Sequence, residues 1–216
     1  MLFLQAQIRP HFLYNAFNTI SAIALTDGVK ASELIDDLAI YLRGCFGNDV
    51  NRGLVTIDTE LGIVNSYVHI EQARFGRRLQ FKLIQNTRRG FSLPPLTIQP
   101  LVENAIRHAT LDSYQEIQIQ VTITEENEYI HIEIQDNGVG IEPVKIANLL
   151  NEEQDGYQGG IGLRNVSRRL KLHYGIPLDI QTSPGAGTTI LIRIPLNSKF
   201  QEDELEHGYN SNQQHP

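Results

Sequence analysis

The feature that most constrains this chain is an alternating run that ends in an Asp-x-Gly-x-Gly turn. Residues 129–134 read Tyr-Ile-His-Ile-Glu-Ile, an alternation that predicts a half-buried strand. Asp136, Gly138 and Gly140 follow, and the two glycines let the backbone turn with no side chain in the way. A carboxylate here can accept a hydrogen bond from an amino group, while bare backbone lets a flat, phosphate-bearing ligand approach. Asp-Asn-Gly is also ordinary hairpin chemistry, so the turn alone leaves both interpretations open.

The bulk composition is that of a globular chain with an acidic balance. Its 216 residues can form one large or two small domains, each able to bury a core. The net charge of −7 argues against a nucleic-acid partner, because such proteins usually carry a basic face. Cys45 is the single cysteine, which excludes an internal disulfide, fits a reducing compartment and predicts a buried apolar residue. No apolar run approaches the roughly 18–20 residues that span a bilayer, and no signal-peptide pattern is present, so we expect a soluble, cytoplasmic chain.

Two amphipathic helices are predicted at the N-terminus. In the first, apolar residues recur in steps of three and four and form one seam: Phe3, Ala6, Pro10, Leu13, Phe17, Ile20 and Ala24. His11 lies about 130° from the centre of that seam, on a polar side shared with Gln7, Asn15 and Asn18, and Pro10 bends or restarts the helix. The second helix carries its own apolar face: Leu34, Ile35, Leu38, Tyr41, Leu42 and Phe46. A hairpin of two helices is too thin to bury both stripes, so we expect pairing with a second copy into a four-helix bundle.

A mixed domain is predicted after the hairpin. Residues 56–76 form a connecting helix that Thr56 or Asp58 can cap. The remaining pattern predicts strands at 79–84, 116–124, 128–135, 178–182 and 188–194, and helices at 96–109, 143–150 and 162–174. Hairpins join most of these strands, which favours an α+β sandwich. The predicted organisation is a helical segment over 1–55, a sandwich domain over 56–196 and a disordered acidic tail over 197–216.

Three stretches of the second domain carry residues suited to chemistry. In the helix over 99–109, Leu101, Ala105 and His108 share a face, and the amide oxygen of Asn104 suits Mg²⁺. The second stretch is the Asp136 turn. The third, residues 159–165, places glycines at the start of a helix whose amides can receive phosphate oxygens, and the polar residues 151–156 before it are expected to form a lid. Each stretch alone has an ordinary interpretation, a surface amide or a plain helix start, but their order is hard to obtain by chance.

The three stretches resemble the N, G1 and G2 boxes of the GHKL ATPase superfamily, which includes histidine kinases, gyrase, Hsp90 and MutL. Residues 5–15, Gln-Ala-Gln-Ile-Arg-Pro-His-Phe-Leu-Tyr-Asn, resemble the phosphoacceptor box of sensor histidine kinases of the LytS/YehU type. Residues 69–76 and 94–105 resemble two further signatures of that family, and the likeness covers about residues 4–195. Arg9 stands where the family usually has Asn, and Ala109 where Gly is usual.

The resemblance implies a role for several single residues. Asp136 would bind the adenine amino group, and Asn104 would hold Mg²⁺ on the phosphates of ATP. The other residues implied in ATP binding are Arg107, His108, Gly138, Gly140, Gly160, Gly162, Leu163 and Thr188, of which the glycines would let loops close over the nucleotide and Thr188 would support the adenine end. Glu103 stays ambiguous, because its position does not match the water-activating Glu of the hydrolytic relatives.

The reaction that the resemblance implies is phosphoryl transfer from ATP to His11 and then to an Asp of a response regulator, within a homodimer. Neutral imidazole is already a nucleophile, so positioning and charge neutralisation matter more than a strong base. Phe12 follows His11 where many other histidine kinases have an acidic residue, so any assisting base must come from elsewhere. Asn15, one turn along, is expected to orient the ring by a hydrogen bond.

Two other functions stay open at this point: a GHKL ATPase that hydrolyses ATP to drive conformational change, and a nucleotide-binding module without catalysis. The sensory and membrane segments typical of the family have no counterpart here, so we expect the cytoplasmic catalytic portion of a larger sensor or a natural soluble variant, with membrane contact only through segments absent from this chain. His69, His131 and His173 are interpreted as structural, His207 and His215 as part of the tail, and their spacing does not predict a metal site.

Overall fold

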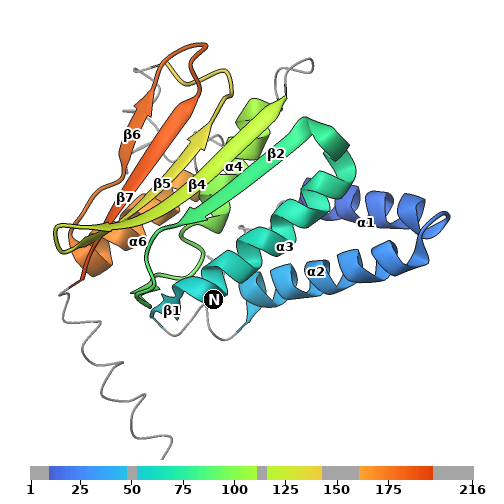
Figure 1. The fold of residues 1–216 in the computed structure, drawn as a ribbon, viewed down its shortest axis with the longest axis horizontal. Coiled ribbons are helices and arrows are strands. Elements are labelled where there is room, and N and C mark those ends of the chain that lie inside the picture. The colour runs from blue at the N-terminus through green and yellow to red at the C-terminus, as the bar shows by residue number, and fades with distance from the viewer. Residues whose placement is uncertain (1–9, 48–52, 111–115, 143–160, 197–216) are drawn as a thin grey trace, which may run out of the picture.

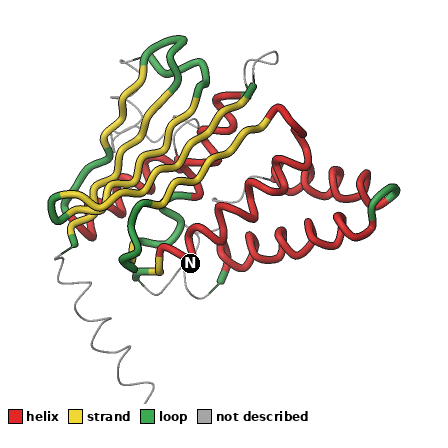
Figure 2. Tube along the Cα trace, in the orientation of Figure 1, coloured by secondary structure: helices red, strands yellow, loops and turns green. Residues whose placement is uncertain are grey.

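The computed structural model describes residues 10–47, 53–110, 116–142 and 161–196, which form a helical part beside a sheet (Figures 1 and 2). The helices are α1 (Pro10–Ala24), α2 (Gly28–Phe46), α3 (Ile57–Phe75), α4 (Gln99–Ala109) and α6 (Ile161–Tyr174), with a 3₁₀ turn, η2, at Gly76–Arg78. The strands are β1 (Val55–Thr56), β2 (Leu79–Gln85), β3 (Ser92–Leu93), β4 (Ile117–Glu126), β5 (Tyr129–Asp136), β6 (Asp179–Thr182) and β7 (Thr188–Pro195). The predicted helix over 143–150, the lid segment, Gly160 and the tail lie outside the described residues.

Helix α1 is described from Pro10 to Ala24. Its buried residues are Phe12, Ala16 and Ile20. Of the predicted seam, Ile20 is buried within the chain, Leu13 is half-buried, and Phe17 is 55% exposed. Because α1 packs against both α2 and α3, its buried stripe is turned towards Phe12. His11 lies on the exposed side, as predicted.

Helix α2 begins after Asp27, whose side chain accepts a hydrogen bond from the Lys30 backbone N–H at 2.9 Å. It buries Ala31, Leu34, Leu38, Tyr41 and Cys45. Ile35 and Phe46, predicted for the same face, are exposed. Burial raises the pKa of the Cys45 thiol to about 12, and the prediction of a buried, unreactive cysteine is confirmed.

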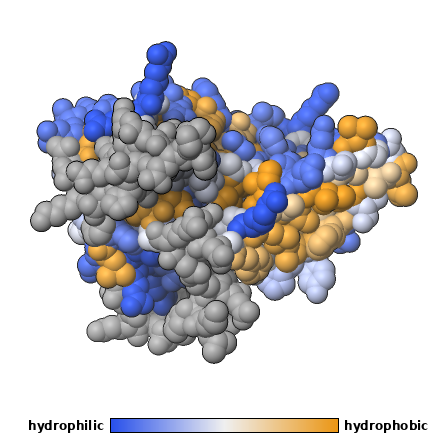
Figure 3. All heavy atoms as spheres, turned by 90° about the horizontal axis from the view of Figure 1, so that it is seen from below, coloured by the Kyte–Doolittle hydropathy of each residue, from blue (hydrophilic) through white to orange (hydrophobic). Residues whose placement is uncertain are grey.

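Helix α3 adds a third layer to the hairpin. Thr56 caps it, as predicted, by accepting the Thr59 backbone N–H at 3.3 Å. The rings of Phe12 in α1, Tyr41 in α2 and Tyr67 in α3 meet with centroid separations of 4.9, 4.9 and 5.7 Å. One apolar stripe of the hairpin is therefore covered by α3 of the same chain, a contact that the sequence had not predicted. A second row of apolar side chains stays exposed along the hairpin (Figure 3).

The sheet has the strand order β2-β4-β5-β7-β6. β2 pairs with β4 in parallel, and the other neighbours are antiparallel. Asn127 and Glu128 form the β4–β5 turn with φ of 50° and 66°, the left-handed values that a two-residue hairpin with the right twist requires. β1 and β3 form a separate two-stranded ribbon. The predicted α+β sandwich is confirmed, and the largest shift of a predicted end is at α4, which begins at Gln99 rather than Leu96.

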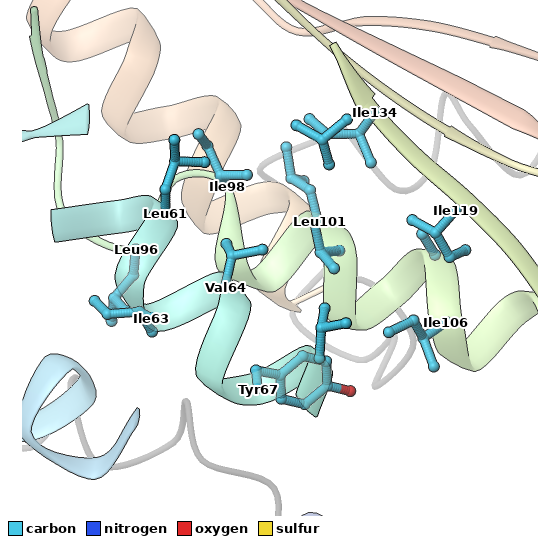
Figure 4. Packing of buried hydrophobic residues seen from close by; sticks show 14 of the residues in the cluster. Leu61, Ile63, Val64, Tyr67, Leu96, Ile98, Leu101, Ile106, Ile119 and Ile134 are labelled. Carbon is cyan, nitrogen blue, oxygen red and sulfur yellow. The ribbon is translucent and has the colours of Figure 1, made fainter. Parts of the chain in front are cut away.

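Helices α4 and α6 cover one face of the sheet (Figure 1). Figure 4 shows how α4 is packed: Leu101 and Ile106 lie towards Ile119 of β4 and Ile134 of β5. On its other side α4 meets α3, which contributes Leu61, Val64 and Tyr67. The helix is thus held between α3 and the sheet, and this position gives it access to both parts of the molecule. Among the described residues, no helix is long and apolar enough to cross a membrane.

Candidate functional site

One cavity collects the residues that the three sequence stretches predicted. Its lining comes from α4, β5, β6, β7, the turn after β5 and the start of α6: Leu101, Asn104, Ala105, Arg107, His108, Ile134, Asp136, Ile141, Leu163, Ile180, Thr188 and Ile190. We call it the α4–sheet cavity. Apolar walls with a few polar groups are typical of a site for a flat ligand that needs fixed orientation. Predicted site residues from α4, the Asp136 turn and the α6 helix start therefore meet in space.

Asp136 lies at the end of β5, directly opposite Thr188 of β7. The carboxyl group is buried, and its Oδ1 accepts the Gly138 backbone N–H at 2.8 Å. Burial raises the pKa of Asp136 to about 6, while hydrogen bonds from the Gly138 and Thr188 backbones act in the opposite direction. Near neutral pH this carboxylate is a fixed acceptor for an N–H donor of a ligand.

Two glycines of the Asp136 turn are required for different reasons. A Cβ on Gly138 would lie 2.8 Å from Asp136 Oδ1 and 3.0 Å from the backbone of Ala109, so a side chain would push the carboxylate or α4 aside. Gly140 has φ of 69°, and a Cβ there would collide with the Ser183 carbonyl. The predicted bare backbone thus has a steric basis in both places.

Two hydrogen-bonding residues that hold this turn in place were missed by the sequence reasoning. Asn137 Oδ1 accepts the Gln118 backbone N–H at 2.8 Å, and its Nδ2 donates to the Glu116 carbonyl at 2.7 Å. Thr182 Oγ1 accepts the Ile141 backbone N–H at 2.9 Å and donates to the Gly187 carbonyl at 2.8 Å. Asn137 could have been found from its place inside the motif, but no local signal marks Thr182, which comes from a different strand.

The polar groups of α4 form a connected set at the edge of the cavity. Arg107 Nη2 donates to Asn104 Oδ1 at 3.2 Å and lies 3.0 Å from His108 Nε2. Because a guanidinium only donates, Nε2 accepts and neutral His108 carries its proton on Nδ1. The start of α6 lies against this set, since a Cβ on Gly162 would be 3.5 Å from Asn104 Nδ2. This is an ordinary van der Waals distance, so a side chain at position 162 would not clash with Asn104.

A divalent cation fits this site only together with a phosphate-bearing ligand. Asn104 supplies one amide oxygen, and no group of three or more His, Cys, Asp or Glu side chains within the described ranges could hold a metal by itself. Mg²⁺ accepts such a sparse protein set, because it keeps waters and takes further oxygens from substrate phosphates. Asn104 as a Mg²⁺ ligand therefore stays a prediction.

A second cavity of about 290 Å³, which we call the histidine cavity, lies between α1, α3 and α4. It is lined by His11, Phe12, Asn15, Tyr67, Glu71, Arg74, Phe75, Glu103, Ile106, Arg107 and Thr110. Asn15 Nδ2 lies 3.0 Å from His11 Nδ1, so the predicted hydrogen bond between these side chains is present. Arg107 lines both cavities, which makes it the side chain common to the two.

A buried ionic network holds the start of α4. Glu60 of α3 is 0% exposed and accepts the backbone N–H groups of Leu96, Thr97 and Ile98, the last two at 3.0 and 2.9 Å. Arg169 of α6 donates to the Leu96 carbonyl at 2.6 Å. Leu96 has φ of 55°, a left-handed conformation that a side chain disfavours, and these contacts stabilise it. Burial is the main reason why the pKa of Glu60 is raised.

The remaining described histidines lie outside both cavities. His69 Nδ1 is 3.4 Å from Asp37 Oδ2, which joins α3 to α2. The His131 ring packs edge-on against Tyr129, and that of His173 is tilted against Tyr174. These surroundings agree with the structural roles expected of them.

Two protein families match this chain, one over its N-terminal part and one over the remainder. Residues 1–79 match the family described as histidine kinase, and residues 95–198 match the family described as histidine kinase-, DNA gyrase B-, and HSP90-like ATPase. The chain is 41% identical to the protein YwpD of Bacillus subtilis (strain 168) over 198 residues, 91% of this chain and 70% of YwpD.

Two sensor proteins are also similar. Identity is 37% over 205 residues with the sensor protein LytS of Bacillus anthracis, covering 93% of this chain and 34% of that protein. Identity is 36% over 204 residues with the sensor histidine kinase/phosphatase LytS of Staphylococcus aureus (strain MRSA252), covering 92% of this chain and 35% of that protein. The chain thus spans about a third of the length of these two relatives.

Solved structures share the fold at low sequence identity. The histidine kinase domain of the blue-light activated histidine kinase EL346 from Erythrobacter litoralis has a TM-score of 0.51 at 17% identity, covering 93% of both chains. The mycobacterial sensor histidine kinase MprB also has a TM-score of 0.51, at 15% identity, over 66% of this chain and 97% of the other. Together with the family matches, the curated relatives show that the chain belongs to the sensor histidine kinases of the LytS type, with a nucleotide-binding region of the histidine kinase-, DNA gyrase B- and HSP90-like type.

Proposed function

We propose that this chain is the catalytic portion of a sensor kinase that transfers the γ-phosphoryl group of ATP to His11 and then to an Asp of a response regulator. The observation that carries the proposal is the position of α4. One side of this helix lines the α4–sheet cavity, another lines the histidine cavity with His11, and Arg107 belongs to both. A phosphoryl donor and its acceptor require such adjoining sites.

In this proposal the α4–sheet cavity binds ATP. Asp136 accepts a hydrogen bond from the adenine amino group, and Thr188, beside it in the sheet, supports the same end. Asn104 would hold Mg²⁺, which supplies charge neutralisation on the phosphates when bound. Arg107, His108 and Leu163 line the same cavity. Gly138, Gly140, Gly160 and Gly162 would let loops close over the nucleotide, as the family resemblance implies.

On the acceptor side, the ring of His11 must be oriented before it attacks phosphorus. Asn15 restrains it through the 3.0 Å contact with Nδ1, so Nε2 is the nitrogen left to bond phosphorus once its proton is removed. As the N–P bond forms, the bond from the γ-phosphorus to its bridging oxygen breaks and ADP leaves. Arg107 is the cation between the two cavities and is suited to stabilise the charge that moves between them.

We further propose that residues 1–55 mediate homodimerisation and that 56–196, with 56–76 as connecting helix, form the ATP-binding domain. Exposed apolar side chains on the hairpin support self-association: Phe17, Leu25, Val29, Ile35, Ile40 and Phe46. Figure 3 shows an apolar area over the helical end of the molecule. Such a patch on an otherwise polar surface is typical of a protein interface. Membrane anchoring, where the full-length protein has it, would come from segments outside this chain.

The test is incubation with γ-³²P-ATP and Mg²⁺ of the wild type beside His11→Gln and Asn104→Asp. We expect a label on the wild type alone that is lost in acid and kept in base, followed by transfer to an added receiver domain. Label on His11→Gln would exclude the assigned acceptor. Tight ATP binding without label would indicate a binding module, and sustained phosphate release without phosphoprotein would indicate an ATPase.

A further inference from the structure

The acid that is missing after His11 has a counterpart elsewhere in the histidine cavity. Glu71 of α3 lines this cavity with His11, and it is only 3% exposed. Glutamate side chains are rarely buried, because taking a carboxylate out of water costs free energy. The burial of Glu71 in this cavity therefore calls for a role beyond that of a surface residue. We propose that Glu71 is the proton acceptor for His11 during phosphoryl transfer, an inference that rests on the proposed transfer to His11.

The relative placement of the two side chains is set by an aromatic contact between their helices. Phe12, next to His11, packs on Tyr67 with ring centroids 4.9 Å apart. Tyr67 precedes Glu71 by four residues, so the two lie on the same side of α3. Figure 4 shows Tyr67 projecting from α3 on the side of α4. The Phe12–Tyr67 contact therefore holds α1 against α3 where both His11 and Glu71 line the cavity.

A proton acceptor is required by the state of the imidazole ring. The Asn15 amide nitrogen can only donate, so His11 Nδ1 accepts and the neutral ring carries its proton on Nε2. Nε2 must lose this proton to attack phosphorus. With Phe12 following His11 in the chain, the adjoining position supplies no carboxylate. The proton therefore needs a group from another helix.

The surroundings of Glu71 suit it to that task. Four groups face it or share its cavity: His11 on α1, Arg74 on its own helix, and Glu103 and Arg107 on α4. Arg74 Nη1 lies 3.3 Å from Glu71 Oε2. Burial raises the pKa of Glu71, and the nearby Glu103 adds to this, while Arg74 lowers it. A carboxylate with raised proton affinity is a better general base than a solvated one.

The step balances. Nε2 bonds to the γ-phosphorus, the bond to the bridging oxygen breaks with its electron pair leaving on ADP, and the Nε2 proton passes to the Glu71 carboxylate. A cavity of about 290 Å³ has room for water, since one molecule takes about 30 Å³ of liquid volume, so the proton can cross through it. The products are phosphohistidine, ADP and a neutral Glu71.

The experiment is single-turnover autophosphorylation at saturating Mg-ATP from pH 5.5 to 9, with ATP affinity measured separately. For Glu71→Gln we expect a loss of roughly 100-fold or more in rate, the scale of general-base catalysis, with ATP affinity within about twofold of wild type. Glu71→Gln should lose the part of the acidic limb that follows Glu71, and Glu71→Asp should recover part of the rate. Arg74→Gln should keep the limb but shift it to higher pH, because the lowering influence of that cation on the Glu71 pKa is lost.

The control is Glu33→Gln, an exposed carboxylate on α2, which should leave rate and profile unchanged. Two results would overturn the inference: a Glu71→Gln rate within a few-fold of wild type, or an Arg74→Gln limb that stays where it was. The Arg74→Gln shift decides the matter even if Glu71→Gln fails to fold. A wild type that takes no label would contradict the proposed function instead.

Discussion

The two cavities beside α4 are built in different ways. The α4–sheet cavity takes its polar residues from short contiguous stretches, and hydrogen bonds of the sheet and its turns hold them, as Asn137 and Thr182 do. The histidine cavity takes its polar residues from three helices far apart in the sequence, and side-chain packing such as Phe12 on Tyr67 holds them. Backbone hydrogen bonds fix a register, whereas packed helices can shift as bodies. We therefore expect the α4–sheet cavity to keep its shape, and the histidine cavity to change shape when α1 moves.

The strongest test of this difference asks whether the histidine cavity works within one chain. His11 and Arg107 of the same chain line it, so we expect transfer in cis. Mixed dimers of a His11→Gln chain and an Asn104→Asp chain, co-expressed with different tags, should then carry no label, because each chain lacks one half of its own site. Wild-type dimers prepared in the same way are the control. Label on the Asn104→Asp chain of the mixed dimer would show transfer between subunits and contradict the expectation.

The next largest effect is expected at the contact between α3 and the start of α4, the helix that lines both cavities. Glu60 accepts three backbone N–H groups ahead of α4, and removing it leaves them buried without that acceptor. We expect Glu60→Ala to lower the free energy of unfolding by about 3–5 kcal/mol, measured by urea denaturation.

Asp58 provides the matched control, because it lies in the same first turn of α3 but is exposed. Asp58→Ala should change the free energy of unfolding by less than about 1 kcal/mol. Equal losses in the two variants would show that the Glu60 network contributes nothing beyond the charge at the helix start.

The smallest expected effect is the pH dependence of ligand binding in the α4–sheet cavity, which depends on Asp136. Because burial raises the Asp136 pKa from 3.8 to about 6, its protonated form favours folding below about pH 3.8, and this contribution is lost as pH rises through about 6. Binding of an amino-group donor needs the ionised form. We expect affinity for adenosine, which has no phosphate to titrate, to fall by about tenfold per pH unit below pH 6 as the ionised fraction falls.

Calorimetric titration of adenosine between pH 5 and 8 measures this profile. Asp136→Asn should bind adenosine more weakly at pH 7.5 and show no change across the range. A wild-type affinity that is flat through pH 6, or an Asp136→Asn profile that still bends there, would remove Asp136 from the role of adenine acceptor.

Much of the fold was predictable because its signals are local. The alternation in β5 and the cap at Thr56 each depend on a few neighbouring residues. The nucleotide-side candidates were predictable for the same reason, since they lie in short motifs at turns and helix starts. Their ordering along the chain then sufficed to expect that they meet.

The errors and omissions involve contacts between distant segments. The sequence did not predict that α3 covers the Phe12 stripe of α1, because the two-helix pattern took no account of a third helix. No neighbouring residues in the sequence indicate the roles of Glu60 and Thr182, because their hydrogen-bond partners lie in other elements. Periodicity indicates that a helix has an apolar side but not which neighbour will cover it.

The sequence by itself determined the order of the main helices and strands, the sandwich class and the short motifs that meet at the α4–sheet cavity, because hydrophobic period, caps and glycine turns act over a few residues. Only the tertiary structure decided that α3 covers the hairpin, that Glu60 and Arg169 hold the start of α4, and that Glu71 shares a cavity with His11. These arrangements depend on how whole helices pack, and the free energy of that packing comes from contacts between residues dozens of positions apart.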